Sequence, residues 1–273
     1  MNHQFEPKSA ANVIYGQDGR IDFFETKDSD LQNMAKSTAA FIDPRFLIYD
    51  SIFDVYNFEN AEPSIPFCST ERFQKQPKFA DCSGTLVGPD IILTAGHCVQ
   101  TTKDCENTRI VFDYTLNSAS EKLISLPAAS VYRCQKIIAF SNIKNSTDFA
   151  LIQLDRTVLG RKPLEFSTEK LTYQDPLMMI GHPMGLPTKM TMNGKVRSLI
   201  PEHHFTASLD AFSGNSGSAV FNQNTKKIVG VLVRGESDFD RKNGCYIAKQ
   251  CDEDGCRGES ITPVSEFLKY LKP

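Results

Sequence analysis

From about residue 50 to residue 260, the chain alternates short apolar, β-branched runs with turn-forming residues. Runs of this length, bounded by Gly, Pro, Asn or Asp, are typical of β-strands. They are CSGTLV (82–87), IILTA (91–95), RIVFDY (109–114), FALIQL (149–154), PLMMIG (176–181), SAVF (218–221) and IVGVLV (228–233). Turn signals stand between them at 88–90, 193–194 and 222–224. Many short strands with few helices predict an all-β fold, either a sandwich or barrels.

The two ends of the chain have a different pattern. Residues 1–48 are polar and free of cysteine, and within them LQNMAKSTAAFI (31–42) follows a capping cluster and is typical of a helix. This segment is either a remnant of a propeptide or an extension packed on the body. The tail SEFLKYLK (265–272) predicts a short C-terminal helix capped by Ser265. With a linker near 159–169, the chain divides into 1–48, 49–160 and 161–273.

Composition narrows the classes of protein. The net charge of −3 and the pI of about 6.0 argue against nucleic acid or an anionic membrane as a partner. No run approaches the ~20 apolar residues that a membrane helix needs. The first twenty residues also lack the apolar core of a signal peptide, so an exported form would rely on a signal that is not present in this sequence.

The eight cysteines indicate disulfides rather than a metal centre. An even number fits an oxidising compartment, so we expect a secreted or periplasmic protein. Zinc sites usually contain paired C-x2-C units or Cys/His clusters, and the sequence has no C-x2-C unit. We therefore expect no metal.

Three segments carry candidate chemistry: TAGHC (94–98), TDFALIQL (147–154) and SGNSGSAVF (213–221). Taken alone, each segment also fits a purely structural interpretation: a packed histidine for the first, a buried strand for the second and a turn for the third. Together they offer a serine, a base and a carboxylate. A serine hydroxyl needs an adjacent base to become a nucleophile, and an imidazole titrates near neutrality. A buried carboxylate would hold the imidazole in the correct tautomer.

These segments, in this order, resemble the active-site segments of the trypsin-like (chymotrypsin-fold) serine peptidases, over roughly residues 65–270. The resemblance implies two packed antiparallel β-barrels, with His97 as general base, Asp148 as its orienting residue and Ser216 as nucleophile. The N–H groups of Gly214 and Ser216 would form the oxyanion hole, and no cofactor is needed. Asn215 stands where trypsin-type enzymes carry Asp. The GNSGS form is similar to the bacterial branch that includes glutamyl endopeptidases and exfoliative toxins.

The resemblance also implies a disulfide between Cys82 and Cys98, which would pin the histidine loop to the preceding strand. The other six cysteines allow 15 pairings. We favour Cys105–Cys134, with Cys245, Cys251 and Cys256 clipping a loop near the substrate pocket and Cys68 taking the remaining partner.

The candidate specificity residues lie around the predicted substrate pocket. Asp210 lies six residues before Ser216, the offset of the pocket carboxylate of trypsin, and so predicts cleavage after Arg or Lys. Arg234 or Arg257 could neutralise it. Leu232 stands where glutamyl endopeptidases carry a histidine that helps to bind the substrate's carboxylate, so the sequence argues against cleavage after glutamate. By the same resemblance, Ser213 lines the pocket and the segment 233–235 (Val233, Arg234, Gly235) pairs with the extended substrate.

The predicted function is that of a secreted serine endopeptidase, which hydrolyses protein or peptide substrates through an acyl-enzyme. Two alternatives stay open: a catalytically silent homologue that binds protein partners, and a latent enzyme whose residues 1–48 block the site. We expect His182, His203 and His204 to be structural or surface residues.

Overall fold

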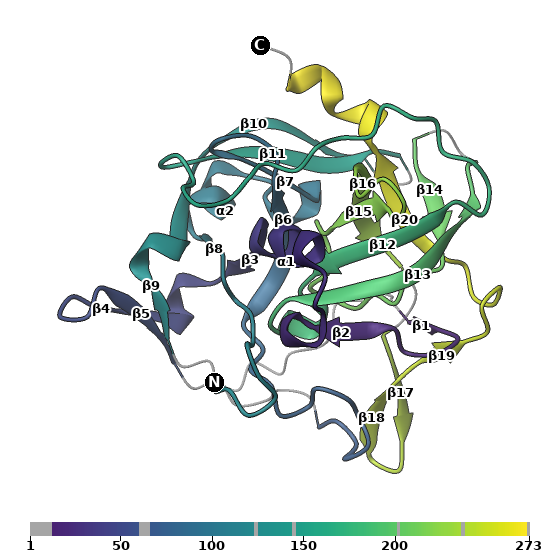
Figure 1. Ribbon diagram of the computed structural model, residues 1–273, viewed down its shortest axis with the longest axis horizontal. Helices are drawn as coiled ribbons and strands as arrows, with labels where there is room; N and C mark the ends of the chain where they lie inside the picture. Colours follow the sequence, from purple (N-terminus) through teal and green to yellow (C-terminus); the bar gives the residue numbers. More distant parts are fainter. Residues whose placement is uncertain are drawn as a thin grey trace.

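Two six-stranded antiparallel barrels make up the body of the protein (Figure 1). The computed structural model describes residues 13–59, 66–122, 125–143, 146–200, 203–235 and 238–271. The first barrel consists of β3 (Thr38–Ile42), β6 (Ala80–Leu86), β7 (Ile91–Thr94), β8 (Arg109–Val111), β10 (Val131–Asn142) and β11 (Asp148–Leu154). The second consists of β12 (Pro176–Gly181), β13 (Lys189–Ser198), β14 (Phe205–Ala207), β15 (Ala219–Asn222), β16 (Ile228–Arg234) and β20 (Glu259–Pro263). Pairing of β12 with β13 closes the second barrel.

Strand alternation explains why so many of these strands are buried on both faces. Along β11, Ile152 and Leu154 fill the inside of the first barrel. Phe149 and Leu151, at the odd-numbered positions of the same strand, face the second barrel, because successive side chains of a strand point to opposite sides. The run FALIQL is therefore almost continuously apolar, although it belongs to an antiparallel sheet.

A shared hydrophobic core joins the barrels. Leu151 from β11 packs in one cluster with Met178, Phe221 and Val231 from the second barrel, all nearly inaccessible to water. Burying a side chain of this size contributes about 1.5–3 kcal/mol relative to its exposed state. The cluster also takes in Met34 from α1 (Ser29–Lys36), so the N-terminal segment is part of the core.

The N-terminal segment is built into both barrels, which changes the expected division of the chain. Asp28 caps α1 by accepting hydrogen bonds from the backbone of Asp30 and Leu31. The predicted helix over 31–42 stops at Lys36, since the next residues form β3 between β6 and β8. The predicted boundary after residue 48 thus follows the first strand of the barrel. Upstream, β2 (Arg20–Asp22) pairs with β13 of the second barrel.

Smaller elements surround the barrels. A three-stranded sheet packs beside the first barrel, and a hairpin extends away from the second (Figure 1). They are β4 (Leu47–Asp50), β5 (Val55–Phe58) and β9 (Ser125–Pro127), then β17 (Phe239–Lys242) and β18 (Cys245–Ala248). A short parallel pair joins β1 (Ile14–Tyr15) to β19 (Gln250–Cys251). Helix α2 spans Thr102–Glu106, and 3-10 turns lie at Phe23–Glu25, Pro44–Phe46, Gly96–Cys98, Ala128–Ser130 and Pro183–Gly185. The predicted C-terminal helix takes the form of two 3-10 turns, Val264–Glu266 and Leu268–Tyr270.

Four disulfides tie these elements together: Cys68–Cys245, Cys82–Cys98, Cys105–Cys134 and Cys251–Cys256. The first links the loop before β6 to β18, across 177 residues of sequence. No helix in the part of the chain that the structure describes is both long and apolar enough to cross a membrane.

Candidate active site

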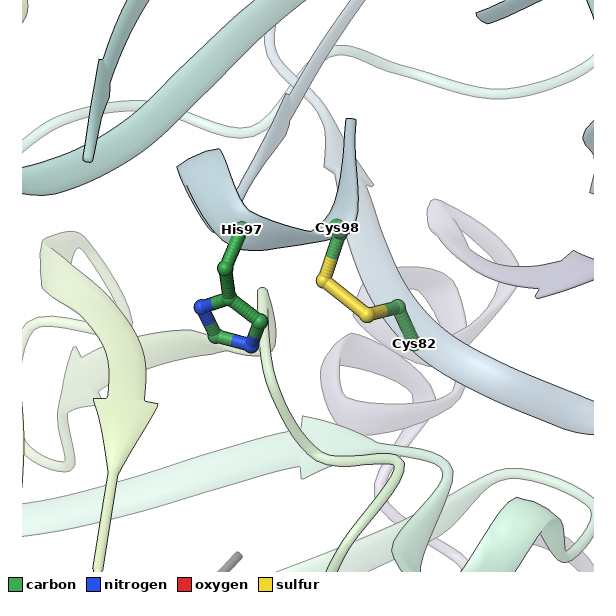
Figure 2. A group of neighbouring side chains, drawn as sticks. All are labelled: Cys82, His97 and Cys98. Atoms are coloured by element: carbon green, nitrogen blue, oxygen red, sulfur yellow. A yellow bond between two sulfur atoms is a disulfide. The ribbon is translucent and has the colours of Figure 1, made fainter. Parts of the chain in front are cut away.

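His97 lies in the 3-10 turn Gly96–Cys98 that follows β7, and its side chain is one-third exposed. The disulfide from Cys98 to Cys82 on β6 fixes the residue next to it (Figure 2). Ligand atoms of Cys82, His97 and Cys98 lie within 4.8 Å of one another, an arrangement that could suggest a metal site. Both sulfurs are oxidised in the disulfide, however, and a metal ion is bound by the thiolate. This cluster therefore has no cysteine ligand to offer.

Asp148 binds both the ring and the backbone of His97. It is the first residue of β11 and is 1% exposed. Its Oδ2 lies 2.9 Å from Nδ1 of His97, and its Oδ1 accepts the backbone N–H of His97 at 3.1 Å. A carboxylate at Nδ1 favours the tautomer with the proton on that nitrogen. Nε2 of the neutral ring is then left as a proton acceptor.

Thr262 on β20 fixes Asp148 in turn. Its hydroxyl donates to the Asp148 carbonyl oxygen at 2.9 Å and accepts from the Asp148 N–H at 3.3 Å. Because β20 belongs to the second barrel, this fully buried contact ties the first residue of β11 to both halves of the molecule.

Ser216 lies in a tight loop whose glycines have positive φ, +92° at Gly214 and +88° at Gly217. A Cβ at position 217 would collide with the carbonyl oxygen of Ser83, so the loop can approach β6 only with glycine there. Ser83 then binds the loop twice. Its N–H donates to the Ser216 carbonyl and its hydroxyl to the Gly214 carbonyl, both at 2.8 Å.

Two backbone donors of this loop are left available. Within the described residues, the N–H groups of Gly214 and Ser216 have no hydrogen-bond acceptor, whereas those of Asn215 and Gly217 donate to Phe212 and Leu232. Asn215 itself is buried, and its Oδ1 accepts from Ser218 at 3.3 Å. Backbone N–H groups that have no other acceptor can stabilise an anion.

The loop of Ser216 and the turn of His97 lie side by side. Sγ of Cys98 is 3.6 Å from the Ser216 carbonyl oxygen, and Cys98 directly follows His97. Among the described residues, the two side chains of His97 and Ser216 share no hydrogen bond. Such contacts often tighten only when substrate binds.

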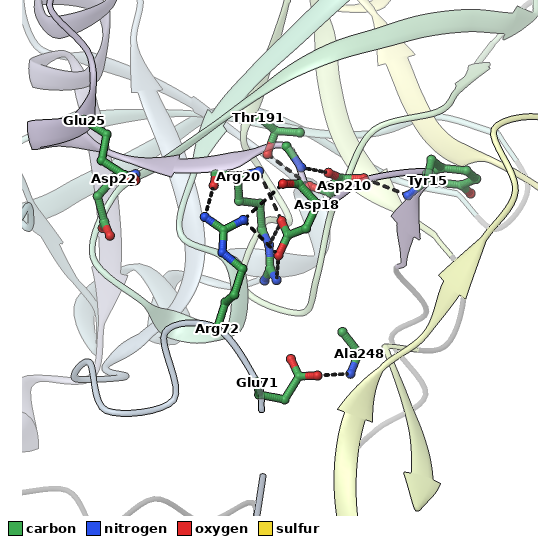
Figure 3. A network of polar contacts seen from close by, with 11 residues as sticks. Tyr15, Asp18, Arg20, Asp22, Glu25, Glu71, Arg72, Thr191, Asp210 and Ala248 are labelled. Carbon is green, nitrogen blue, oxygen red and sulfur yellow. Dashed lines mark hydrogen bonds and ion pairs between the residues drawn. The ribbon is translucent and has the colours of Figure 1, made fainter. Parts of the chain in front are cut away.

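Asp210 has a different environment from that of an open pocket carboxylate (Figure 3). Its two oxygens accept the backbone N–H groups of Tyr15 and Gly19, each at 2.7 Å. Burial raises the pKa of Asp210 to about 6, and these hydrogen bonds and the charge of Arg20 oppose the rise. Asp210 thus anchors the N-terminal segment to the second barrel.

The other specificity candidates are scattered around the loop. Arg234 does not neutralise Asp210, because its Nη2 lies 3.3 Å from Oδ2 of Asp148. Arg257 is exposed on the loop before β20. Val233 is buried between the barrels, and Gly235 follows the end of β16. The substrate-pairing role of 233–235 stays a prediction.

Ser213 is exposed at the start of the loop that carries Ser216, and its N–H donates to Oδ2 of Asp238 at 3.1 Å. Asp238 is 9% exposed, and burial raises its pKa to about 8, although the Ser213 N–H opposes the rise. Its Oδ1 has no partner among the described residues. At neutral pH this carboxyl group is therefore mostly protonated.

The sequence did not predict three of the residues around this site: Ser83, Thr262 and Asp238. Ser83 directly follows Cys82, so its place beside the predicted disulfide was an available signal. Thr262 and Asp238 have no motif around them, because their partners lie far away in the sequence. Of the three other candidate histidines, His182 is buried beside the Ser216 loop, where its N–H donates to Oγ of Ser83 at 3.0 Å and desolvation lowers its pKa to about 3. His203 contacts Glu266, and His204 is half-buried.

Comparisons with known proteins identify the family of this chain. A model of the trypsin-like peptidase domain matches residues 82–231. Proproteinase E of Bos taurus is 27% identical over 109 residues, which are 38% of this chain and 43% of that protein. Chymotrypsin-like elastase family member 3B of Homo sapiens is 28% identical over 105 residues, 38% of each protein. The match thus spans less than half the length of these relatives.

Two solved structures have a similar fold over nearly the whole chain. A Glu endopeptidase matches with a TM-score of 0.54 and 20% identity, over 95% of this chain and 97% of that one. The VesB protease of Vibrio cholerae also has a TM-score of 0.54, with 15% identity, over 95% of this chain and 66% of that one. At these identities the similarity is one of fold, namely two packed antiparallel barrels.

Proposed function

Because this chain belongs to the trypsin-like peptidase family and has its chymotrypsin-like fold, we propose that it is a serine endopeptidase. The observation that carries the proposal is the double contact of Asp148 with His97, through Nδ1 of the ring and the backbone N–H. This contact leaves Nε2 of His97 as the base, beside the loop that carries Ser216. We propose that these three residues act as a Ser-His-Asp triad.

The reaction would follow the acyl-enzyme route. Nε2 of His97 takes the proton from Ser216 as Oγ attacks the peptide carbonyl, and the N–H groups of Gly214 and Ser216 hold the oxyanion. Each such donor is worth roughly 3–4 kcal/mol on the barrier. His97 then gives its proton to the leaving amine and activates a water that hydrolyses the ester. The chain's own residues supply every proton transfer in this route.

Cleavage after Arg or Lys is the finer part of the proposal and depends on Asp210. Each oxygen of this carboxylate already accepts one backbone N–H and has a second lone pair for another donor. The Arg or Lys side chain of a substrate would therefore have to reach the Asp210 carboxylate beside the backbone of Tyr15. Replacing Asp210 with Asn should then shift cleavage away from Arg and Lys, and an unchanged cleavage profile would remove Asp210 from the pocket.

We further propose that the protein acts on protein or peptide substrates outside the reducing cytosol, in a secreted or periplasmic location. Four disulfides support this location, because thiols are kept reduced in most cytosolic proteins. Fractionation of the native source, followed by alkylation of free thiols, tests this part.

One observation favours a second candidate, a latent enzyme. Asp210 is engaged by the N-terminal segment, which could hold the region before Ser216 in an unproductive state. Removing residues 1–48 is unsuitable as a test, since β2, α1 and β3 would be lost. Removing residues 1–19 takes away β1 and the two donors to Asp210 but keeps β2, α1 and β3. Activity that appears only after this truncation would favour latency.

The main test is a digest of a complex peptide mixture, with the cleaved bonds identified by mass spectrometry. The wild type should make cuts that Ser216→Ala fails to make, with a loss of several orders of magnitude in turnover. Ser120→Ala, a change at an exposed serine in a distant turn, should cleave like the wild type. Equal cleavage by Ser216→Ala and wild type would exclude the proposed nucleophile.

A further inference from the structure

Arg234 contacts the same carboxylate oxygen as His97. Oδ2 of Asp148 lies 2.9 Å from Nδ1 of His97 and 3.3 Å from Nη2 of Arg234. The imidazole and the guanidinium are thus bound to one anion from two sides. The Asp148 side chain is 1% exposed, whereas that of Arg234 is 38% exposed, so this cation reaches inward from the edge of the site.

The fold explains how this side chain reaches Asp148. Arg234 is the last residue of β16 in the second barrel, and Asp148 is the first residue of β11 in the first barrel. The pairing of β16 with β20 shifts register between Leu232 and Arg234. An irregularity of this kind re-aims a side chain relative to the regular pleat. The guanidinium therefore bridges the two barrels at the site.

We propose that Arg234 is a positioning residue that holds the Asp148 carboxylate and weakens its stabilisation of protonated His97. This inference rests on the proposed function. A carboxylate beside an imidazole favours the imidazolium, and a nearby cation opposes it. The charge of Arg234 should therefore oppose the protonation of His97 that Asp148 favours.

Few other charges lie beside His97. In the described part of the chain, the charged groups in contact with His97 or with its carboxylate partner are Asp148 from β11 and Arg234 from β16, whereas Cys82 on β6, bonded to the neighbouring Cys98, is uncharged. His204, just before β14, lies near enough to Arg234 for this cation to help lower the His204 pKa, with burial as the larger cause. His204 thus shares the influence of Arg234, so its titration should move in the same direction when that charge is removed.

The size of the effect follows from the geometry. The two cationic groups are at most about 6 Å apart, because both contact Oδ2. At this separation, with the screening expected of a half-exposed guanidinium, repulsion shifts a titration midpoint by roughly half a unit to one unit of pH.

The experiment follows the imidazole of His97 by NMR as a function of pH. The parent is the Ser216→Ala protein, which prevents self-digestion, and the spectrum of a His97→Gln variant assigns the signal. Arg234→Gln should raise the His97 midpoint by roughly half a unit to one unit of pH. Arg234→Lys keeps the charge and should restore most of the parent behaviour. Arg241→Gln removes an exposed cation of β17 and should leave the midpoint unchanged.

An unchanged His97 midpoint in Arg234→Gln, or an equal shift in Arg241→Gln, overturns the inference. If Arg234→Gln fails to fold, Arg234→Met provides a second neutral variant. In the enzyme with Ser216, the acidic limb of kcat/KM should move with the NMR midpoint. Absence of peptidase activity with a shifted midpoint would defeat the proposed function alone. Normal activity with an unshifted midpoint would defeat this inference alone.

Discussion

The backbone N–H of Tyr15 donates a 2.7 Å hydrogen bond to Oδ1 of Asp210, although 195 residues separate the two in sequence. Gly19 binds the other oxygen, and the guanidinium of Arg20 lies 4.2 Å from the centre of the Phe212 ring. The N-terminal segment is therefore fastened to the stretch that leads into the Ser216 loop. Its docking and the order of that loop should change together.

Asp210→Ala should free the N-terminal segment. The change removes the acceptor of the buried Tyr15 N–H and of the part-buried Gly19 N–H, and losing the partner of a buried donor costs about 1–3 kcal/mol. We expect a loss of at least about 2 kcal/mol in the free energy of unfolding, measured with urea. Amide hydrogen exchange should increase at Tyr15 and Gly19. Asp240→Ala, at an exposed carboxylate, provides the control. Unchanged exchange at both amides would contradict the anchoring role.

Asp238 should make stability depend on pH. Burial raises its pKa to about 8 in the folded protein, against 3.8 for an ordinary aspartate. Between these values the unfolded state loses the proton while the folded state keeps it. The contribution of Asp238 to the free energy of unfolding therefore falls as the pH rises from about 4 to about 8.

Asp238→Asn stays neutral and should escape this loss. The free energy of unfolding of Asp238→Asn, relative to wild type, should rise by more than about 1 kcal/mol between pH 4.5 and pH 8. Urea unfolding at the two pH values measures it. Asp240→Asn, two residues along and exposed, should give no such trend. The same difference at both pH values would show that Asp238 ionises normally.

The Cys82–Cys98 disulfide should matter for catalysis as well as for stability. Replacing both cysteines with Ala should cost about 3 kcal/mol, given the separation of 16 residues. Removing Cys251–Cys256, with a separation of 5, should cost about 2 kcal/mol. Only the first change frees the turn that carries His97, so only it should lower kcat in folded protein. Equal kcat losses in both double variants would refute this role.

Thr262→Val should loosen Asp148 while keeping the shape of the buried side chain. Both hydrogen bonds to the Asp148 backbone are lost, at a cost of about 1–3 kcal/mol in the free energy of unfolding. Displacement of the carboxylate should lower kcat roughly tenfold and leave KM nearly unchanged. Thr206→Val, on the neighbouring β14 and half-exposed, is the matched control. A fall in stability without a fall in kcat would limit Thr262 to a structural role.

Much of the fold was predictable because its signals are local. The apolar runs at 149–154 and 228–233 lie within strands, since period, β-branching and turn residues act over a few neighbours. The helix over 31–42 was half wrong for the same reason. Its capping signal at Asp28 is local and correct, but packing of Phe41 and Ile42 into the first barrel decided that the second half is a strand.

For the site, the sequence by itself identified His97, Asp148 and Ser216 as the candidate residues, because the segments around them are each continuous motifs. It also indicated that Cys82 and Cys98 could meet. Tertiary structure decided the partners of the isolated charges. Asp210 binds the backbone of Tyr15 rather than standing alone, and Arg234 binds Asp148 rather than Asp210. The partner of a buried charge depends on which distant backbone and side-chain groups the packing brings within about 3 Å, and no local pattern encodes that.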